Sequence, residues 1–367
     1  MSTDTKYMKH ALTLAKKGAG KTYPNPAVGC VIVKNDIIIG EGWHKRAGGH
    51  HAEIHALEMA GVEARGADVY VTLEPCSHTG KTPPCSEALI RAGVKRVTAG
   101  MSDPNPQVNG GGLKALQQAG IETFCGVLED ECRAINRPFL KFMTSGQPYV
   151  TYKCAMTLDG KIASVTGDSR WISCEASRRI VHRMRAESNA IMVGVDTIIA
   201  DNPQLTVRHI KGNNPLRIIV DSHLRTPESV AVLSSQMAGG TMIATTETNP
   251  KVHARYLKVG ARLLICNSDN GRVDLHDLLN KLGGLGIHSL LLEGGSHLAG
   301  EALRHGLIDE CVFFYAPKVV GSDGFSPFMM TGTTDMAHSI QFCDLNMRRV
   351  GTDIMVTARP ERQCSLD

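Results

Sequence analysis

Long apolar runs are missing from this sequence, and their absence excludes two classes of protein. Residues 1–17 carry charges throughout and contain no apolar core of the kind that marks a secretory signal peptide. No window elsewhere approaches the roughly 20 consecutive apolar residues that a membrane-spanning helix needs. We therefore expect a cytoplasmic protein with no membrane partner.

An excess of charge of one sign is also absent. The formal net charge is +4, from 40 Lys and Arg against 36 Asp and Glu. Nucleic-acid binding needs a concentrated basic face, so we expect no nucleic-acid partner, but small anionic substrates held by local Arg and Lys clusters. The eleven cysteines are an odd number in a chain without an export signal, so a spaced pair is more typical of metal binding or catalysis than of a disulfide.

Length and periodicity predict two α/β domains, because 367 residues exceed one typical domain core. The first series of elements has helices over 5–17, 51–60, 84–92 and 113–118, and strands over 28–33, 37–40, 69–73 and 96–100. After a break around 143–148, the second series has strands over 149–155, 190–195, 216–221, 241–244, 262–266, 288–292 and 311–315. We predict domains over 1–145 and 146–367, with a frayed polar tail over 359–367.

A zinc site is the strongest chemical signal. Catalytic zinc takes three protein ligands and leaves a fourth position open for water, and His51, Cys76 and Cys85 supply three. The metal lowers the pKa of its water, and Glu53 is placed to move protons. His51 and Cys85 both stand at the start of predicted helices, where a thiolate is favoured. The sequence therefore predicts two helix tips that face one zinc ion.

Neighbouring residues leave alternatives open. His50 could replace His51 as a ligand, although the His-x-Glu spacing favours His51. His55 could bind metal with His51 or be an ordinary histidine. Cys30 could be a fourth ligand, but it lies on a predicted strand, where core packing is more typical. A purely structural zinc site would need such a fourth ligand.

The segments His51-Ala52-Glu53, Pro75-Cys76 and Pro84-Cys85 resemble the zinc nucleoside and nucleobase deaminases, whose signature is H-x-E followed by P-C-x-x-C. Eight residues separate the two cysteines here instead of two. That loop, with residues 25–29 and 42–44, is similar to the bifunctional deaminase/reductases of riboflavin biosynthesis. The resemblance implies a cytidine-deaminase-like α/β/α sandwich with Glu53 as the catalytic acid/base. It also implies that these residues bind the deaminase substrate: Asn25, His44, His78, Lys81 and Thr82.

Gly80-Lys81-Thr82 does not belong to an ATP-binding P-loop, because Pro75 stands where that motif needs its first glycine. The second half likewise has no G-x-G-x-x-G fingerprint. Instead, residues 288–304 predict a strand, a Gly294-Gly295-Ser296 turn and a helix whose N-terminus suits a phosphate. A plain turn with Gly300 as a packing residue is the alternative.

Residues 151–161, 169–173 and 190–208 resemble the reductases of the same family. The resemblance implies a dihydrofolate-reductase-like α/β domain that uses NADPH. It places these residues around NADPH: Ala155, Trp171, Thr197, Asp201, Ser222, Gly295, Ser296, His297, Leu298, Ala299, Gly300 and Glu301. It places these around the second substrate: Ser169, Arg185, Leu205, Arg208 and Glu293.

Charged residues of the second half suggest roles in phosphate binding and in acid/base catalysis. Arg185 and Arg208 suit a fork on a substrate phosphate, although an Arg-rich helix is often just a solvated face. Lys153 lies on an apolar strand, where an unpaired ammonium is costly. Lys153 and Asp201 are therefore the candidate acid/base residues of the reduction.

The resemblance implies two reactions: hydrolytic deamination of a diaminopyrimidinone ribosylamine 5′-phosphate, then reduction of the ribosyl group to ribityl by NADPH. One alternative is a zinc deaminase of tRNA or another nucleic acid, fused to a reductase-like domain. Others are a non-catalytic zinc-stabilised binding module and a dihydrofolate-specific second half. The sequence leaves open whether the chain forms a homo-oligomer.

Overall fold

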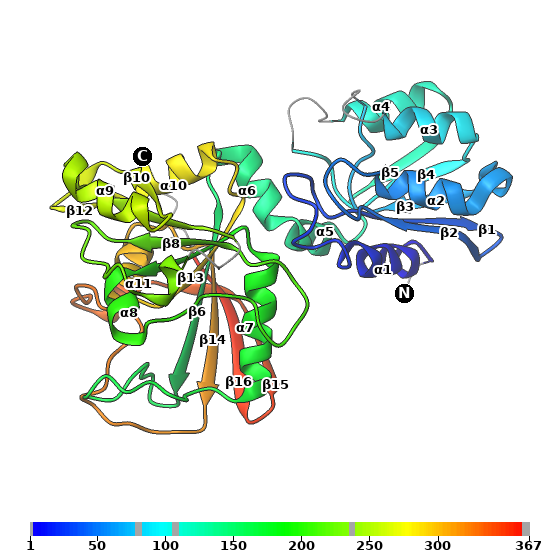
Figure 1. Cartoon of the computed structure of the whole chain (residues 1–367). Helices are drawn as coiled ribbons and strands as arrows, with labels where there is room; N and C mark the ends of the chain where they lie inside the picture. Colours follow the sequence, from blue (N-terminus) through cyan, green and yellow to red (C-terminus); the bar gives the residue numbers. More distant parts are fainter. Residues whose placement is uncertain (1–2, 78–82, 105–109, 235–238, 362–367) are drawn as a thin grey trace. The chain divides into compact units, whose positions relative to one another are not determined.

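The computed structural model describes residues 3–77, 83–104, 110–234 and 239–361. Two compact units divide the chain, Met1–Gly146 and Gln147–Asp367, and each has its own sheet and core (Figure 1). Within the described ranges, none of the helices combines the length and apolar character needed to cross a membrane.

The first unit is built on a five-stranded sheet in the order β2-β1-β3-β4-β5. Strand β1 is antiparallel to β2 and β3, whereas β3, β4 and β5 are parallel. Its strands are β1 (Gly29–Lys34), β2 (Ile37–Trp43), β3 (Asp68–Val71), β4 (Arg96–Ala99) and β5 (Glu122–Cys125). Its helices are α1 (Thr3–Ala15), α2 (Ala52–Ala60), α3 (Cys85–Ala92), α4 (Gly111–Gln118), α5 (Glu129–Ile135) and α6 (Arg137–Ser145).

Two glycines of the β1–β2 hairpin let helices approach both faces of this sheet. A Cβ atom on Gly29 would lie 2.0 Å from the carbonyl oxygen of Ala11 in α1, and one on Gly42 would lie 2.1 Å from that of Ala52 in α2. Gly42 is the cross-strand partner of Cys30 and so shares its face of the sheet, whereas Gly29, the residue before Cys30, points to the other face. Helices α1 and α2 therefore cover opposite faces, which gives three α/β/α layers.

The second unit contains a nine-stranded sheet in the order β10-β9-β8-β7-β13-β6-β14-β16-β15. The strands from β10 to β14 in this order are parallel, and β16 and β15 add an antiparallel hairpin at one edge. The strands are β6 (Tyr149–Thr157), β7 (Ala190–Gly194), β8 (Leu216–Val220), β9 (Thr241–Thr245), β10 (Arg262–Ile265), β13 (Ser289–Glu293), β14 (Glu310–Ala316), β15 (Phe342–Val350) and β16 (Asp353–Pro360), with a small pair, β11 (Ser268–Asp269) and β12 (Arg272–Val273). The helices are α7 (Glu175–Glu187), α8 (Val195–Asp201), α9 (Pro250–Lys258), α10 (Leu275–Gly284) and α11 (Ser296–Arg304).

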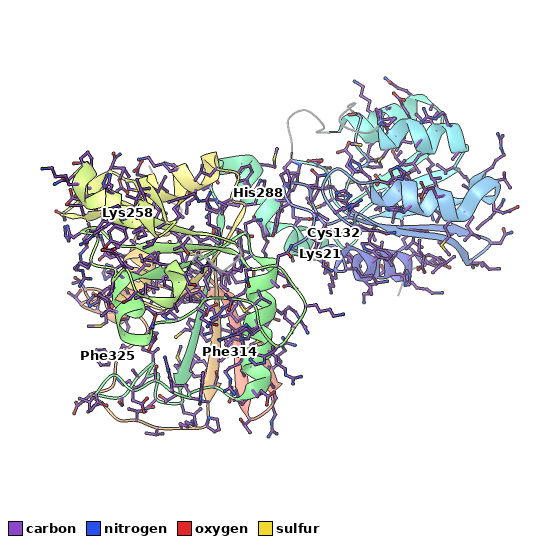
Figure 2. All side chains as sticks on the ribbon, in the orientation of Figure 1. Lys21, Cys132, Lys258, His288, Phe314 and Phe325 are labelled. Carbon is purple, nitrogen blue, oxygen red and sulfur yellow. The ribbon has the colours of Figure 1, made fainter. Side chains whose placement is uncertain are left out.

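Helix α7 covers the sheet over β14. Phe314 of β14 is fully buried and belongs to one apolar cluster with Val181 of α7 (Figure 2). The carboxyl ends of β6, β7 and β13 lead into loops and helices that line a large cavity, and residues of α7 line it as well. Ligands of open α/β sheets bind at such strand ends.

The predicted tail over 359–367 is wrong at its start. Arg359 and Pro360 belong to β16 and pair with Cys343 and Phe342 of β15. The guanidinium of Arg359 also lies 3.0 Å from the carboxylate of Asp344. The hairpin escaped prediction because most side chains of β15 are exposed, so its sequence lacks the alternation of a half-buried strand.

Candidate functional sites

The residues predicted to bind zinc come together at two helix N-termini. His51 caps α2, Cys85 is the first residue of α3, and Cys76 lies in the loop that follows β3. The Nδ1 atom of His51 lies 3.6 Å from the Sγ of Cys76 and 3.3 Å from the Sγ of Cys85. All three donor atoms lie within 4.8 Å of one another, close enough to share one metal ion.

The charge state of the two thiols fits a cation. A hydrogen bond from the Cys85 thiol lowers the pKa of Cys76, and the backbone N–H of Cys85 donates to the same sulfur at 3.3 Å. The same hydrogen bond, together with burial, raises the pKa of Cys85 far above its ordinary value. The pair therefore retains one proton, which a divalent ion would displace. One nitrogen and two sulfur donors suit zinc.

Cys30 does not join this cluster. Its side chain is fully buried in the apolar core of the first unit, and burial raises its thiol pKa well above the ordinary value. Among the described residues, the donor atoms within 4.8 Å of one another at this site are those of His51, Cys76 and Cys85. Three ligands are the number typical of a catalytic zinc site, whereas a structural site has four.

Glu53 lies beside the cluster, in the first turn of α2. Its carboxyl is 3% exposed, and burial, followed by the negative charge of Cys76, raises its pKa to about 7. A carboxyl with this pKa can both accept and donate a proton near neutral pH, which is the property that general acid–base catalysis requires.

Asn25 and His44 lie next to the cluster. His44 Nδ1 donates to the carbonyl oxygen of His50 at 3.0 Å, so its Nε2 accepts from the amide of Asn25 at 3.1 Å. Burial lowers the pKa of His44, and the ring meets that of His51 edge to face at 5.2 Å. These contacts fix a neutral His44 and orient Asn25. The other three predicted substrate residues, His78, Lys81 and Thr82, lie outside the described residues.

Sequence reasoning missed Glu74, a buried carboxylate two residues before Cys76. Its buried carboxylate accepts hydrogen bonds from the backbone N–H groups of Asp103 and Gly110, and from Gly112 and Leu113 at the start of α4. An anion is favoured at a helix N-terminus. Glu74 therefore anchors the chain two residues before Cys76; its position before Pro75-Cys76 was the available signal.

We predict that Cys85→Ala lowers the tightly bound zinc, which survives dialysis against metal-free buffer, from about one equivalent to nearly zero, because two ligands do not retain the ion. Metal analysis of the purified protein after dialysis measures this. Cys30→Ala is the matched control, since it removes a buried thiol of the same unit that lies outside the cluster. An unchanged ratio in Cys85→Ala would remove this residue from the ligand set.

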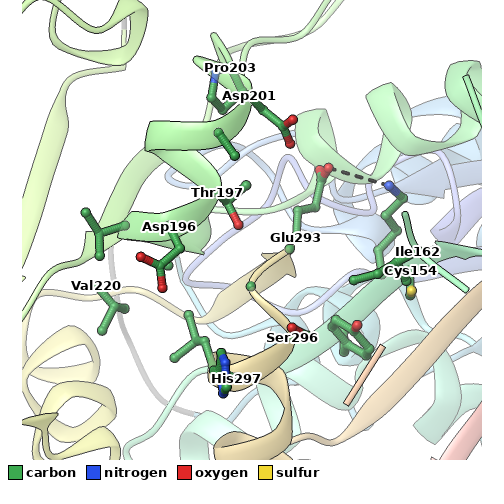
Figure 3. A pocket seen from close by; sticks show the side chains of 18 of the residues that line it. Cys154, Ile162, Asp196, Thr197, Asp201, Pro203, Val220, Glu293, Ser296 and His297 are labelled. Atoms are coloured by element: carbon green, nitrogen blue, oxygen red, sulfur yellow. Dashed lines mark ion pairs between the residues drawn. The ribbon is translucent and has the colours of Figure 1, made fainter. Parts of the chain in front are cut away.

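The second unit contains a cavity of about 1390 Å³. All five residues predicted to bind the reductase substrate line it, as do Lys153 and Asp201. Of the residues predicted to surround NADPH, these line it: Ala155, Trp171, Thr197, Asp201, Ser222, Gly295, Ser296, His297, Leu298 and Glu301. Figure 3 shows the carboxylates of Asp201 and Glu293 in the same part of the cavity, with Ser296 and His297 below them.

Ala299 and Gly300 do not line the cavity. Both are buried in α11, and a Cβ atom on Gly300 would lie 2.6 Å from the carbonyl oxygen of Met329. Gly300 is therefore a packing glycine. In the turn before it, Gly294 and Gly295 have φ values of 91° and 83° and lead into the N-terminus of α11, where backbone N–H groups favour an anion.

Glu293 is the centre of a buried ion network. It pairs with Lys153 in the register between β13 and β6, which places the two side chains on one face, with 3.8 Å between Nζ and Oε2. Arg185 of α7 donates two hydrogen bonds, of 2.7 and 2.8 Å, to the same carboxylate. Its remaining terminal nitrogen donates to the carbonyl oxygen of Thr206 at 3.0 Å. In this structure, Arg185 thus binds Glu293 and the loop after α8 rather than presenting an open fork.

His182, one turn before Arg185 on α7, is a second residue that sequence reasoning missed. Its Nδ1 accepts a hydrogen bond of 3.1 Å from the backbone N–H of Arg208. Burial, with the positive charges of Arg185 and Arg208, lowers its pKa to about 4, so the ring is neutral at pH 7. His182 also lines the cavity and is 6% exposed. A buried histidine within an Arg-rich helix was the signal that could have identified it.

Comparisons with known proteins agree with the predicted fold classes of both halves of the chain. Residues 1–101 match the family model of the cytidine and deoxycytidylate deaminase zinc-binding region, and residues 148–356 match that of the RibD C-terminal domain. The predicted α/β classes of the two halves are thereby confirmed.

Relatives match over nearly the whole chain. Riboflavin biosynthesis protein RibD of Actinobacillus pleuropneumoniae is 44% identical over 96% of this chain and 94% of its own, and that of Escherichia coli is 44% identical over 96% and 98%. The solved structure of Acinetobacter baumannii RibD is 39% identical and covers 98% of this chain and 99% of its own, with a TM-score of 0.86.

A structure from Thermotoga maritima, named a diaminohydroxyphosphoribosylaminopyrimidine deaminase/5-amino-6-(5-phosphoribosylamino)uracil reductase, is 37% identical over 98% of this chain and 99% of its own, with a TM-score of 0.84. Together with a cluster of three side chains that could hold a metal ion in one unit and a large cavity at the strand ends of the other, these matches establish that the chain belongs to the RibD family of bifunctional deaminase/reductases of riboflavin biosynthesis.

Proposed function

We propose that the first unit hydrolytically deaminates 2,5-diamino-6-ribosylamino-4(3H)-pyrimidinone 5′-phosphate, which gives 5-amino-6-(5-phosphoribosylamino)uracil. The second unit then uses NADPH to reduce the ribosyl group of this product to ribityl. The observation that carries the first step is the meeting of His51, Cys76 and Cys85 beside the buried Glu53. The large cavity around Lys153, Asp201 and Glu293 supports the second.

In the first unit, His51, Cys76 and Cys85 would hold zinc, and Glu53 would move the protons. The chemistry that a bound zinc supplies is a Lewis acid that lowers the pKa of water to about 7. Glu53 accepts a proton from that water and donates one to the departing ammonia, for which a pKa of about 7 is suited. Asn25 and the neutral His44 hold the pyrimidine ring, together with His78, Lys81 and Thr82.

In the second unit, NADPH would lie along the carboxyl ends of the strands, with its phosphates near the Gly294-Gly295 turn. The chemistry that it supplies is a hydride for C1′ of the ribosyl group. Lys153 is held by Glu293 and points its ammonium into the cavity, where it would donate a proton or hydrogen bond to the sugar oxygen during ring opening. Asp201 is the second acid/base candidate.

Arg208 is the better of the two predicted arginines for the substrate phosphate. Its side chain is exposed at the cavity and makes a 3.1 Å hydrogen bond to Gln204, whereas Arg185 is engaged by Glu293. We predict that Arg208→Ala raises the KM for the pyrimidine ribotide roughly 10- to 100-fold, as expected for a hydrogen bond to a charged group of about 1.5–3 kcal/mol. The KM for NADPH should change little. An equal loss for both ligands would place Arg208 outside the phosphate site.

His182 acts as a positioning residue for Arg208 in this proposal. The acceptor oxygen of an Asn side chain lies two bonds from Cβ, as does Nδ1 of histidine. The acceptor oxygen of Gln lies three bonds away. We therefore predict that His182→Gln raises the KM for the ribotide by a factor of a few to about ten, with kcat and the KM for NADPH nearly unchanged, and that His182→Asn restores the KM. Equal KM values in both variants would contradict this role.

We also infer that the enzyme acts in the cytoplasm and forms a homo-oligomer. The ten cysteines that the structure describes are all free thiols, which suits a reducing compartment. Leu345 and Met347 on the edge strand β15, and Ile354 on β16, are exposed apolar side chains at an unpaired sheet edge. A second copy of the chain would cover this edge.

One assay tests the proposed function. Zinc-loaded protein is given the diaminopyrimidinone ribotide and NADPH, and ammonia release and NADPH oxidation are followed together. We expect both signals, with ammonia first. Ammonia without NADPH oxidation would contradict the second assignment, and turnover of dihydrofolate in its place would identify the alternative. If neither signal appears with metal-loaded protein, tight and salt-sensitive RNA binding would favour a nucleic-acid deaminase.

A further inference from the structure

A second group of metal-binding side chains lies on the outer surface of α2, apart from the catalytic cluster. It consists of His50, His55 and Glu58, whose donor atoms all lie within 4.8 Å of one another. Among the described residues, these two clusters are the groups of three or more such side chains that are close enough to share an ion. His50, the alternative to His51 considered from sequence, and His55, considered as its partner, therefore belong together rather than with His51, Cys76 and Cys85.

Local structure brings the three residues together. His55 and Glu58 are three residues apart on α2, so they occupy one helix face. His50 precedes the helix cap His51, and its ring reaches over the first turn to the same face, with 5.7 Å between its centroid and that of His55. The Glu58 carboxylate bridges the two rings, with 2.9 Å from Oε1 to Nδ1 of His50 and 3.4 Å from Oε2 to Nδ1 of His55.

These distances are close to those of a coordinated ion. A tetrahedral ion with bonds of about 2.1 Å to nitrogen and oxygen holds its ligand atoms about 3.4 Å apart. Two imidazoles and one carboxylate form a ligand set that zinc uses elsewhere, and imidazole also suits other late first-row metals. We propose that His50, His55 and Glu58 form a second transition-metal site, weaker than the catalytic centre because His50 and Glu58 are more than half exposed to water.

The two sites are joined through the backbone. The carbonyl oxygen of His50 holds the ring of His44, and His51 is the next residue. An ion on the His50 side chain would therefore bind one residue from a catalytic ligand and on the segment that orients His44.

Zinc binding to the metal-free full-length chain at neutral pH, measured by equilibrium dialysis, tests the site. We expect two equivalents for the wild type, a tight one and a weaker one, and only the tight one in Glu58→Gln and His50→Ala. His10→Ala is the matched control, because His10 pairs with the carboxylate of Glu41 at 2.7 Å without a third ligand. This variant should keep both equivalents.

A titration with cobalt shows which of the two sites binds the metal first. Titration with Co²⁺ should give a thiolate-to-metal charge-transfer band with the first equivalent and none with the second. A single equivalent in the wild type, or a second one that persists in both Glu58→Gln and His50→Ala, would overturn the proposal. Failure of the proposed deaminase chemistry is a separate result, because it would leave the weak equivalent unchanged and would be seen in ammonia release.

Discussion

Replacement of Glu53 by Gln should abolish ammonia release while zinc stays bound. The amide has the shape of the carboxyl but cannot accept a proton, so both proton transfers are lost. Loss of one general acid–base group typically lowers rates by on the order of 10²- to 10⁴-fold, and we expect the upper part of this range because Glu53 would serve in both transfers. Burial already raises the pKa of Glu53 to about 7, so the neutral amide should be tolerated in this position.

The same chain supplies the controls. NADPH oxidation with 5-amino-6-(5-phosphoribosylamino)uracil, which enters after the deamination step, should be unchanged in Glu53→Gln. Glu87→Gln alters an exposed carboxyl in the first turn of α3, two residues after Cys85, and should leave ammonia release intact. Loss of zinc from Glu53→Gln would make Glu53 a ligand or a structural residue, and full activity would favour a non-catalytic zinc module.

The meeting of His51, Cys76 and Cys85 could be predicted from sequence because local structure fixes the positions of two of them. His51 and Cys85 begin helices, and the start of a helix can be predicted from neighbouring residues alone. The His-x-Glu spacing also separated His51 from His50. The hydrogen bonds of Glu74 could not be predicted in this way, because they reach the backbone of Asp103, Gly110, Gly112 and Leu113, which lie about 30 to 40 residues away along the chain.

The cavity of the second unit depends on the order of strands in a parallel sheet, which sequence spacing does not determine. Lys153 and Glu293 were both named, but their pairing requires β6 and β13 to be neighbours although six other strands, β7 to β12, separate them along the chain. Resemblance placed Arg185 in the substrate site, and its guanidinium suited a fork on a phosphate together with Arg208. The structure places it against Glu293 because α7 packs over the sheet at that point, a tertiary relation that no local pattern contains.

Replacement of Glu293 by Gln should cause the largest loss of stability in the second unit. The buried carboxylate balances the charges of Arg185 and Lys153, whose side chains are 13% and 18% exposed. The amide keeps the shape but leaves two cations without a counter-charge, and removal of one partner from a buried ion pair costs about 3–5 kcal/mol. Urea unfolding followed by circular dichroism measures the loss, and zinc release marks the unfolding of the first unit separately.

An exposed ion pair on the same helix provides the control. Glu175 and Arg179 of α7 lie 3.1 Å apart, with side chains 71% and 63% exposed. Surface pairs of this kind contribute about 0–1 kcal/mol, so Glu175→Gln should hardly change the unfolding midpoint. Equal effects of the two substitutions would mean that the network around Glu293 is hydrated and contributes little.

The pH dependence of the unfolding free energy is an independent test of the charge on Glu293. Burial by itself would raise the pKa of Glu293, but the charge and hydrogen bonds of Arg185, with Lys153, more than offset burial and lower it. A carboxyl whose pKa is lower in the folded state adds stability above its unfolded pKa of about 4.3, and that stability is lost as the pH falls through the folded pKa. The difference in unfolding free energy between the wild type and Glu293→Gln should therefore be constant above pH 5 and shrink below about pH 4. A difference that grows on acidification would mean that Glu293 is protonated in the native protein, and Lys153 would then lack the charged partner that holds it in the cavity.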